Sequence, residues 1–119
     1  MDLAAKLQIK PGQRVAIVAG EAGVRISLPS ECETVADPDA ADAVIAFARA
    51  SGDIAEFAGP ALAAARAGKL AWIAYPKAGQ LGTDLNRDVL AVRIAGEGVR
   101  PVRQVAIDDV WSALRFRPA

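Results

Sequence analysis

Short apolar runs, separated by segments with the spacing of helices, are the feature that most limits what this chain can fold into. Three of them, at residues 14–19, 42–48 and 70–75, are too short for core helices and contain β-branched or aromatic side chains. Such runs are typical of strands that are covered on both faces, and these occur in parallel sheets. Parallel strands need crossover connections, which are right-handed. The sequence therefore predicts an α/β protein.

The segments after the second and the third run have apolar residues at helical spacing. Residues 51–53 are typical of a helix start, and the Gly-Pro pair at 59–60 predicts either a turn before a helix or a kink. Thr83 is expected to cap the next helix, with Asp84 in its first turn. The apolar stripe of that helix has helical spacing at Leu85, Val89 and Val92. Each of these two runs is thus expected to continue into a helical segment.

The first crossover is expected to be unusually short. Residues 24–28 leave room for one or two helical turns before Pro29, and residues 33–36 predict only a weak strand. Ahead of the first run, residues 3–7 predict a short packing helix that stops before Pro11. The short crossover lacks the long helix whose N-terminus could face an anionic ligand.

The end of the chain predicts an antiparallel hairpin made of residues 99–107 and 112–117. No repeat or linker divides the sequence, so residues 1–119 are expected to form one domain. The predicted fold is a three-layer, Rossmann-like (methyltransferase-like) α/β fold with a mixed sheet of about six strands. The expected strand order is 33–36, 14–19, 42–48, 70–75, 112–117 and 99–107.

Missing residue types exclude several kinds of chemistry. The chain has no histidine, and Cys32 is its only cysteine. An imidazole base, a histidine metal ligand and an internal disulfide are therefore excluded. We expect no catalytic residue, no metal site and no cofactor, and the sequence favours a non-enzymatic role without deciding the question.

The charge balance argues against a strongly anionic partner. Lysine plus arginine equals aspartate plus glutamate at 14 each, so the formal net charge is zero and nucleic acid is not favoured as a partner. No apolar run is longer than the one at residues 70–75, which is far shorter than the roughly 20 residues that span a bilayer. The N-terminus lacks a secretory signal pattern. We expect a cytoplasmic protein that does not bind membranes.

One candidate ligand site lies where three strands are expected to end. Gly20, Glu21 and Gly23 follow the first run, whereas Arg49 and Lys77 follow the second and the third. Ligands of open α/β sheets bind outside the carboxyl ends of the strands, and two cations there could hold a phosphate or a carboxylate. A glycine turn and solvated loop cations explain the same residues. Both interpretations remain open.

The expected hairpin supplies the other candidates. Trp111 could pack in the core, cover the crevice as a lid or anchor a protein interface. Arg115 belongs to a group of hairpin arginines that could contact nucleic acid, although only one aromatic residue lies among them. The group consists of Arg100, Arg103, Arg115 and Arg117. Charged edge strands also keep sheets from pairing with one another, which is the alternative interpretation.

Three segments, at residues 68–77, 83–85 and 106–115, give the sequence a family resemblance. Through them the chain resembles a bacterial family of small proteins of unknown function, which implies no activity, cofactor or site residue. The topology is similar to the second half of a Rossmann-type methyltransferase, whose sheet also ends in an antiparallel hairpin. Such enzymes have a three-glycine turn after the first strand, where this chain has only Gly20 and Gly23. Asp37 could replace their ribose-binding carboxylate or form an ordinary turn before proline.

Three functions follow as hypotheses. The first is a non-catalytic protein-interaction or regulatory module, because histidine and a long first crossover are both missing. The alternative is a small nucleotide- or S-adenosylmethionine-binding protein that uses the crevice, and the third is a weak nucleic-acid binder. A homodimer is expected because apolar residues make up 53% of a short chain. The expected partners are therefore a second copy or another protein, and a small anionic ligand if the crevice is used.

Overall fold

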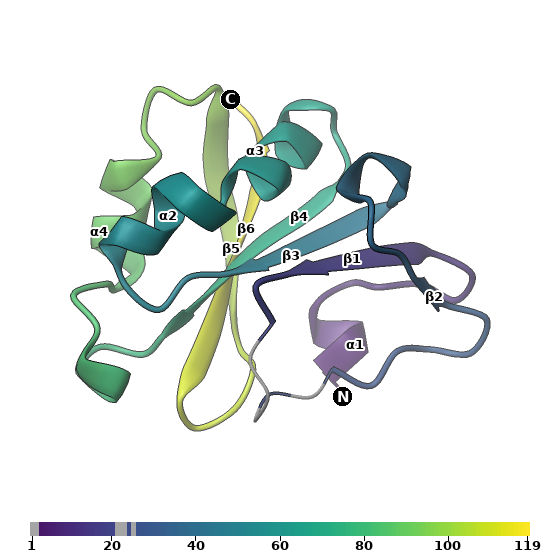
Figure 1. The fold of residues 1–119 in the computed structure, drawn as a ribbon, viewed down its shortest axis with the longest axis horizontal. Coiled ribbons are helices and arrows are strands. Elements are labelled where there is room, and N and C mark those ends of the chain that lie inside the picture. The colour runs from purple at the N-terminus through teal and green to yellow at the C-terminus, as the bar shows by residue number, and fades with distance from the viewer. Residues whose placement is uncertain (1–2, 21–23, 25) are drawn as a thin grey trace.

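The computed structural model describes residues 3–20, 24 and 26–119, which build one six-stranded mixed sheet (Figure 1). Its strand order is β2-β1-β3-β4-β6-β5, which confirms the order expected from the sequence. Strands β2, β1, β3 and β4 are parallel, and β6 and β5 form the antiparallel hairpin. The strands are β1 (Arg14–Val18), β2 (Glu33–Thr34), β3 (Ala43–Phe47), β4 (Leu70–Pro76), β5 (Val99–Ala106) and β6 (Trp111–Pro118).

The two faces of the sheet are covered very differently. The helices are α1 (Leu3–Lys6), α2 (Ser51–Phe57), α3 (Gly59–Arg66) and α4 (Arg87–Arg93). Helices α2, α3 and α4 cover one face, with Ile54, Ala61 and Leu90 in that core (Figure 1). Among the described residues, the opposite face carries only α1 and the irregular segments before β1 and β2. The third layer of the fold is therefore thin.

The chain before β1 packs on this thinly covered face. Leu7 and Ile9 are buried there against the central strands. The indole nitrogen of Trp72, on β4, donates a hydrogen bond to the carbonyl oxygen of Leu7 at 3.0 Å. Every residue of β3 and β4 is buried, as expected for apolar strands at the centre of a parallel sheet.

Helix α4 begins later than the sequence predicts. Its N-cap is Asn86, whose side chain accepts a hydrogen bond from the Val89 amide, so the prediction of Thr83 as the cap was wrong. Thr83 instead accepts a hydrogen bond from the Leu85 amide, and Leu85 enters the core ahead of the helix. The helix buries Leu90, and Val92 is 75% exposed rather than part of the packed stripe.

The connection after β3 and the connection between β1 and β3 also differ from single regular helices. A helix precedes the Gly-Pro pair as well as following it, and α2 and α3 meet at Ala58. Within residues 24–28, the described positions form no helix, so the helical turns expected there were wrong. The 3₁₀ turn Pro38–Ala40 lies between β2 and β3, and its cap is Asp37, whose carboxylate accepts from the Asp39 amide at 2.9 Å.

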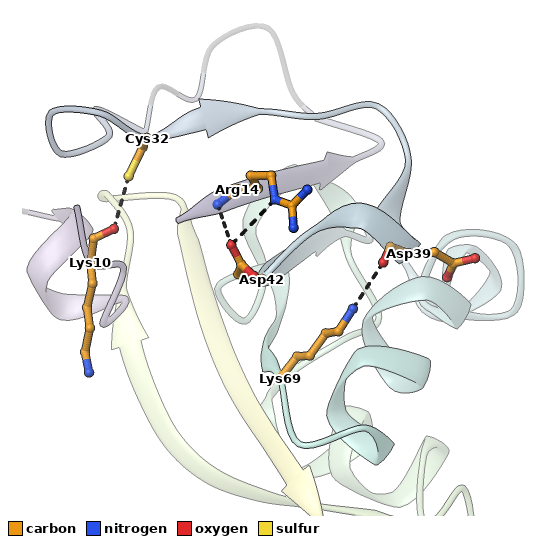
Figure 2. A network of polar contacts seen from close by, with 6 residues as sticks. All are labelled: Lys10, Arg14, Cys32, Asp39, Asp42 and Lys69. Carbon is orange, nitrogen blue, oxygen red and sulfur yellow. Dashed lines mark hydrogen bonds and ion pairs between the residues drawn. The ribbon is translucent and has the colours of Figure 1, made fainter. Parts of the chain in front are cut away.

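Polar contacts hold the edge of the sheet near β2 (Figure 2). The Asp42 carboxylate accepts from the Arg14 amide at 2.9 Å and lies 3.9 Å from its guanidinium. The Lys69 ammonium donates to the carbonyl oxygen of Asp39 at 3.2 Å. The first contact thus links β1 to the residue before β3, and the second links the 3₁₀ turn to the residue before β4.

Candidate functional site

The carboxyl edge of the sheet brings the expected cations to neighbouring strands. Arg49 follows β3 and Lys77 follows β4, and the Ala48 amide bonds to Ala74 between these strands at 2.9 Å. Arg49 is exposed and Lys77 is half-buried, with its backbone amide bonded to the carbonyl oxygen of Val110 at 2.7 Å. Neither cation lines the hollow beside Arg115 that is described below. The two residues share an edge, as expected, but they do not contribute to that hollow.

The glycine turn can be placed only in part. Gly20 lies two residues after the end of β1 at the same edge, and a Cβ added to it would lie 3.1 Å from the Ile17 side chain. Glu21 and Gly23 lie outside the described residues. Asp37, the candidate for a ribose contact, caps the turn before β3, as an ordinary turn aspartate does.

The N-terminus of α2 faces this edge and already holds carboxylates. Asp53 accepts hydrogen bonds from the amides of Arg49 and Ala50 at 3.0 and 3.3 Å. Asp84 accepts from the Ser51 amide at 2.8 Å and from the Ser51 hydroxyl. These hydrogen bonds lower the pKa of Asp84 from its usual value. The amides of Arg49, Ala50 and Ser51, which an anionic ligand could use, are therefore already bonded to carboxylates of the chain itself.

A second candidate site lies on the hairpin, on the thinly covered face of the sheet. Arg100 pairs with Arg117, and Arg103 pairs with Arg115, so each pair lies directly across β5 and β6. Residues opposite one another in a sheet project to the same face. Arg115 also lies opposite Trp72, which belongs to the core under the N-terminal segment. We call these four residues, Arg100, Arg103, Arg115 and Arg117, the arginine face.

A bulge produces this alignment. Arg100 and Arg103 are three positions apart, a spacing that sends side chains to opposite faces of a regular strand. The pairing of β5 with β6 shifts between Pro101 and Arg103, so that Val102 is an extra residue. Both arginines therefore project to the same side as Arg115 and Arg117.

The arginine face has no anionic partner in the described part of the chain. None of its members forms an ion pair with a carboxylate there, whereas Arg14, Arg66 and Arg87 do. Arg100, Arg103 and Arg117 are exposed, and Arg115 is half-buried. Positive charge is thus concentrated locally on a chain whose formal net charge is zero.

Trp111 and Arg115, the expected interface or lid residues, lie in different surroundings. Trp111 is 4% exposed and its ring packs edge-on against Phe47, with ring centroids 5.2 Å apart. This is the core-packing position among the three interpretations. Arg115 extends to the N-terminal segment, where one of its terminal nitrogens donates to the side-chain oxygen of Gln8.

Beside Arg115 is a hollow that sequence reasoning missed. It is lined by Gln8, Lys10, Gln13, Leu70 and Arg115 and has a volume of about 270 Å³. Gln8 and Arg115 are 107 positions apart, and the sequence pattern around residues 8–13 indicates only a packing segment and a turn. No sequence signal links the two, because the contact depends on the completed sheet.

The described residues offer little support for metal binding or for insertion into a membrane. No group of three or more potential metal ligands comes together among them. Within those residues, no helix has the length and apolar character to cross a membrane. The Cys32 thiol donates a hydrogen bond to the carbonyl oxygen of Lys10 at 3.2 Å (Figure 2).

No protein-family model matches the sequence, and no curated protein is similar to it.

Proposed function

We propose that the chain is a non-catalytic binding module whose arginine face recognises an acidic segment of a partner protein. The observation that carries this proposal is the pairing of Arg100 with Arg117 and of Arg103 with Arg115. Like charges directly opposite one another destabilise a sheet. A carboxylate-rich partner would remove that repulsion and form charge-assisted hydrogen bonds with the guanidinium groups.

Protection of the sheet edge does not explain all four residues of the arginine face. β5 is the edge strand, and charges at Arg100 and Arg103 can keep it from pairing with another sheet. β6 lies between β4 and β5, and its residues from Trp111 to Arg115 are paired with both strands. Arg115 therefore has no edge to protect, although Arg117 lies beyond the last pair with β4, and a partner accounts for all four residues.

An acidic protein segment fits better than nucleic acid. Single strands are bound largely by stacking bases on aromatic side chains. The aromatic residues of the hairpin and of the neighbouring strand β4 are all buried, namely Trp72, Tyr75, Trp111 and Phe116. The planar guanidinium group matches a carboxylate with two parallel hydrogen bonds. We therefore place nucleic acid second and make it an outcome of the test.

The test is fluorescence anisotropy with a labelled polyglutamate peptide. A neutral glycine-serine peptide of equal length is the control ligand. The parent chain should bind polyglutamate, and more weakly as salt increases, because exposed charges are screened. Replacement of both Arg100 and Arg117 by glutamine should weaken binding. Arg87→Gln, which removes an exposed arginine from α4 on the other face, should not.

Two results would contradict the proposal. One is equal binding of the charged and the neutral peptide. The other is tighter binding of single-stranded or duplex DNA than of polyglutamate, with the same dependence on Arg100 and Arg117, which would favour the nucleic-acid alternative.

A homodimer remains a separate proposal, and it would need another surface. Two copies of the arginine face would repel each other, so self-association would exclude Arg100, Arg103 and Arg117 from the contact. Light scattering on the full chain measures the mass directly. A monomeric mass at high concentration would remove the dimer and leave the acidic-partner proposal unaffected.

A further inference from the structure

The hollow beside Arg115 presents hydrogen-bond donors almost exclusively. Its oxygen acceptors are already engaged, since the Gln8 oxygen accepts from Arg115 and the Gln13 oxygen accepts from the Lys10 amide at 2.9 Å. The side-chain groups left for a ligand are the two amide NH₂ groups, the Lys10 ammonium and the guanidinium of Arg115. None of its lining residues is acidic.

The charge of Arg115 is not compensated. Its Nε atom is buried and has no hydrogen-bond partner in the described structure. Burial, together with the positive charges of Arg117 and Arg103, lowers the pKa of Arg115 from its usual value. A partly buried charge without a counter-ion is unfavourable, and a bound anion would relieve it.

The backbone beside the hollow is held in an unusual conformation. α1 ends with bonds from the Gln8 amide to Ala5 and from the Ile9 amide to Ala4, which is a Schellman motif. Gln8 occupies its left-handed position, with φ of 63°, where glycine is the usual residue. A glycine could make the turn but could not hold Arg115, so the glutamine keeps the guanidinium in place at a cost in backbone strain.

We propose that this hollow binds a carboxylate group, with Arg115 as its main ligand and Lys10 as a second positive charge. Its volume of about 270 Å³ is just below the roughly 300–1,000 Å³ of sites for drug-sized ligands, so it suits a group of side-chain size. Lys10 is exposed, and its side chain extends away from the Cys32 contact (Figure 2). The inference rests on the proposed function in one respect. If the arginine face binds an acidic segment of a partner protein, this hollow would bind one carboxylate of that segment.

The test uses small blocked amino acids and the full chain. N-acetyl glutamate methylamide carries only a side-chain carboxylate, N-acetylglutamine carries only a terminal one, and N-acetyl glutamine methylamide carries neither. Nuclear magnetic resonance follows the Nε–H signal of Arg115 during each titration. We expect a saturable shift with a carboxylate and none with the neutral compound, and the better of the two acids identifies the source of the carboxylate.

Variants separate the hollow from the rest of the arginine face. Arg115→Lys keeps the charge but loses the planar guanidinium group, which can donate two parallel hydrogen bonds to a carboxylate. Binding of the preferred acid should therefore weaken at least about tenfold, measured by the backbone amide signals around the hollow. Lys10→Gln changes an exposed side chain and should weaken binding with the fold intact. Arg117→Gln is the matched control, because Arg117 does not line the hollow. It should weaken polyglutamate binding and leave binding of the small acid within about twofold.

The two proposals fail in different ways. Equal shifts with charged and neutral compounds, or binding unaffected by both Arg115→Lys and Lys10→Gln, would overturn the carboxylate site. Polyglutamate binding that depends on Arg100 and Arg117 could still be found in that case. Saturable binding of a small acid without polyglutamate binding would retain the site and overturn the acidic-partner function.

Discussion

Arg103 and Arg115 lie directly opposite each other on β5 and β6, with like charges on one face of the sheet. Opposed like charges are destabilising in antiparallel pairs, whereas opposite charges contribute roughly 0.2–1 kcal/mol. The arrangement thus carries a cost that the described chain does not offset.

Reversing one charge of this pair should stabilise the protein. Arg103→Glu converts repulsion into attraction and should raise the free energy of unfolding by about 0.5–1 kcal/mol in urea titrations. Arg103→Gln removes only the repulsion and should lie between the parent and the glutamate variant. The glutamate variant should also bind polyglutamate more weakly. A loss of stability in both variants would show that Arg103 is held by favourable contacts.

Gln8 allows the backbone strain to be separated from its hydrogen bond. Gln8→Ala retains the strained left-handed φ and loses the bond to Arg115, whereas Gln8→Gly loses the bond but relieves the strain. The alanine variant should therefore be the less stable of the two by about 1 kcal/mol. Thermal and urea unfolding of both variants measure the difference, and the reverse order would contradict it.

Asp84 should contribute stability that disappears in acid. Hydrogen bonds from Ser51 hold its folded-state pKa below the usual 3.8, so the folded state favours the charged form. This contribution is complete above the unfolded pKa and is lost as the pH falls through the folded pKa. Asp84→Asn should therefore destabilise the protein at neutral pH and flatten its stability between pH 5 and strong acid, measured by urea unfolding. Asp109→Asn, in the exposed hairpin turn, is the control and should leave the pH dependence unchanged.

Lys77 tests the crevice interpretation independently of the hairpin. If a phosphate or a carboxylate binds at the carboxyl edge, Lys77→Ala should weaken it by roughly 1–3 kcal/mol, the range for a charge-assisted hydrogen bond. The backbone bond from Lys77 to Val110 remains, so the fold should persist. A thermal-shift panel of nucleotides and S-adenosylmethionine measures this, with Lys6→Ala on α1 as the control. No shift with any compound, or equal shifts in both variants, would leave Lys77 as a solvated loop cation.

The central strands could be predicted because their apolar runs have only one stable place in an α/β sheet. β3 and β4 are buried at every position, and the strand order followed from their connections. The start of α4 could not be predicted, since Thr83 and Asn86 are both good caps. Burial of Leu85 ahead of the helix decided between them, and that is a tertiary effect.

Only the part of the candidate site that lies within one regular strand could be predicted from the sequence. Alternation places Arg115 and Arg117 on one face of β6, which is visible in the sequence. The same rule would separate Arg100 from Arg103, and it fails because the bulge depends on how β5 pairs with β6. The contact of Gln8 with Arg115 joins the two ends of the chain and has no local signal.

That contact also bears on when the molecule can be completed during synthesis. The segment around Leu7 and Gln8 leaves the ribosome well before its hydrogen-bond partners, which are 65 and 107 positions downstream. Contacts between such distant residues form slowly, because the chain between them must be ordered first. Until β6 is made and paired, the N-terminal segment has no finished surface on which to settle, and Ile9 stays exposed to other chains. The carboxylate-binding hollow is consequently among the last parts of the protein to form, and a chain truncated before Arg115 would lack it altogether.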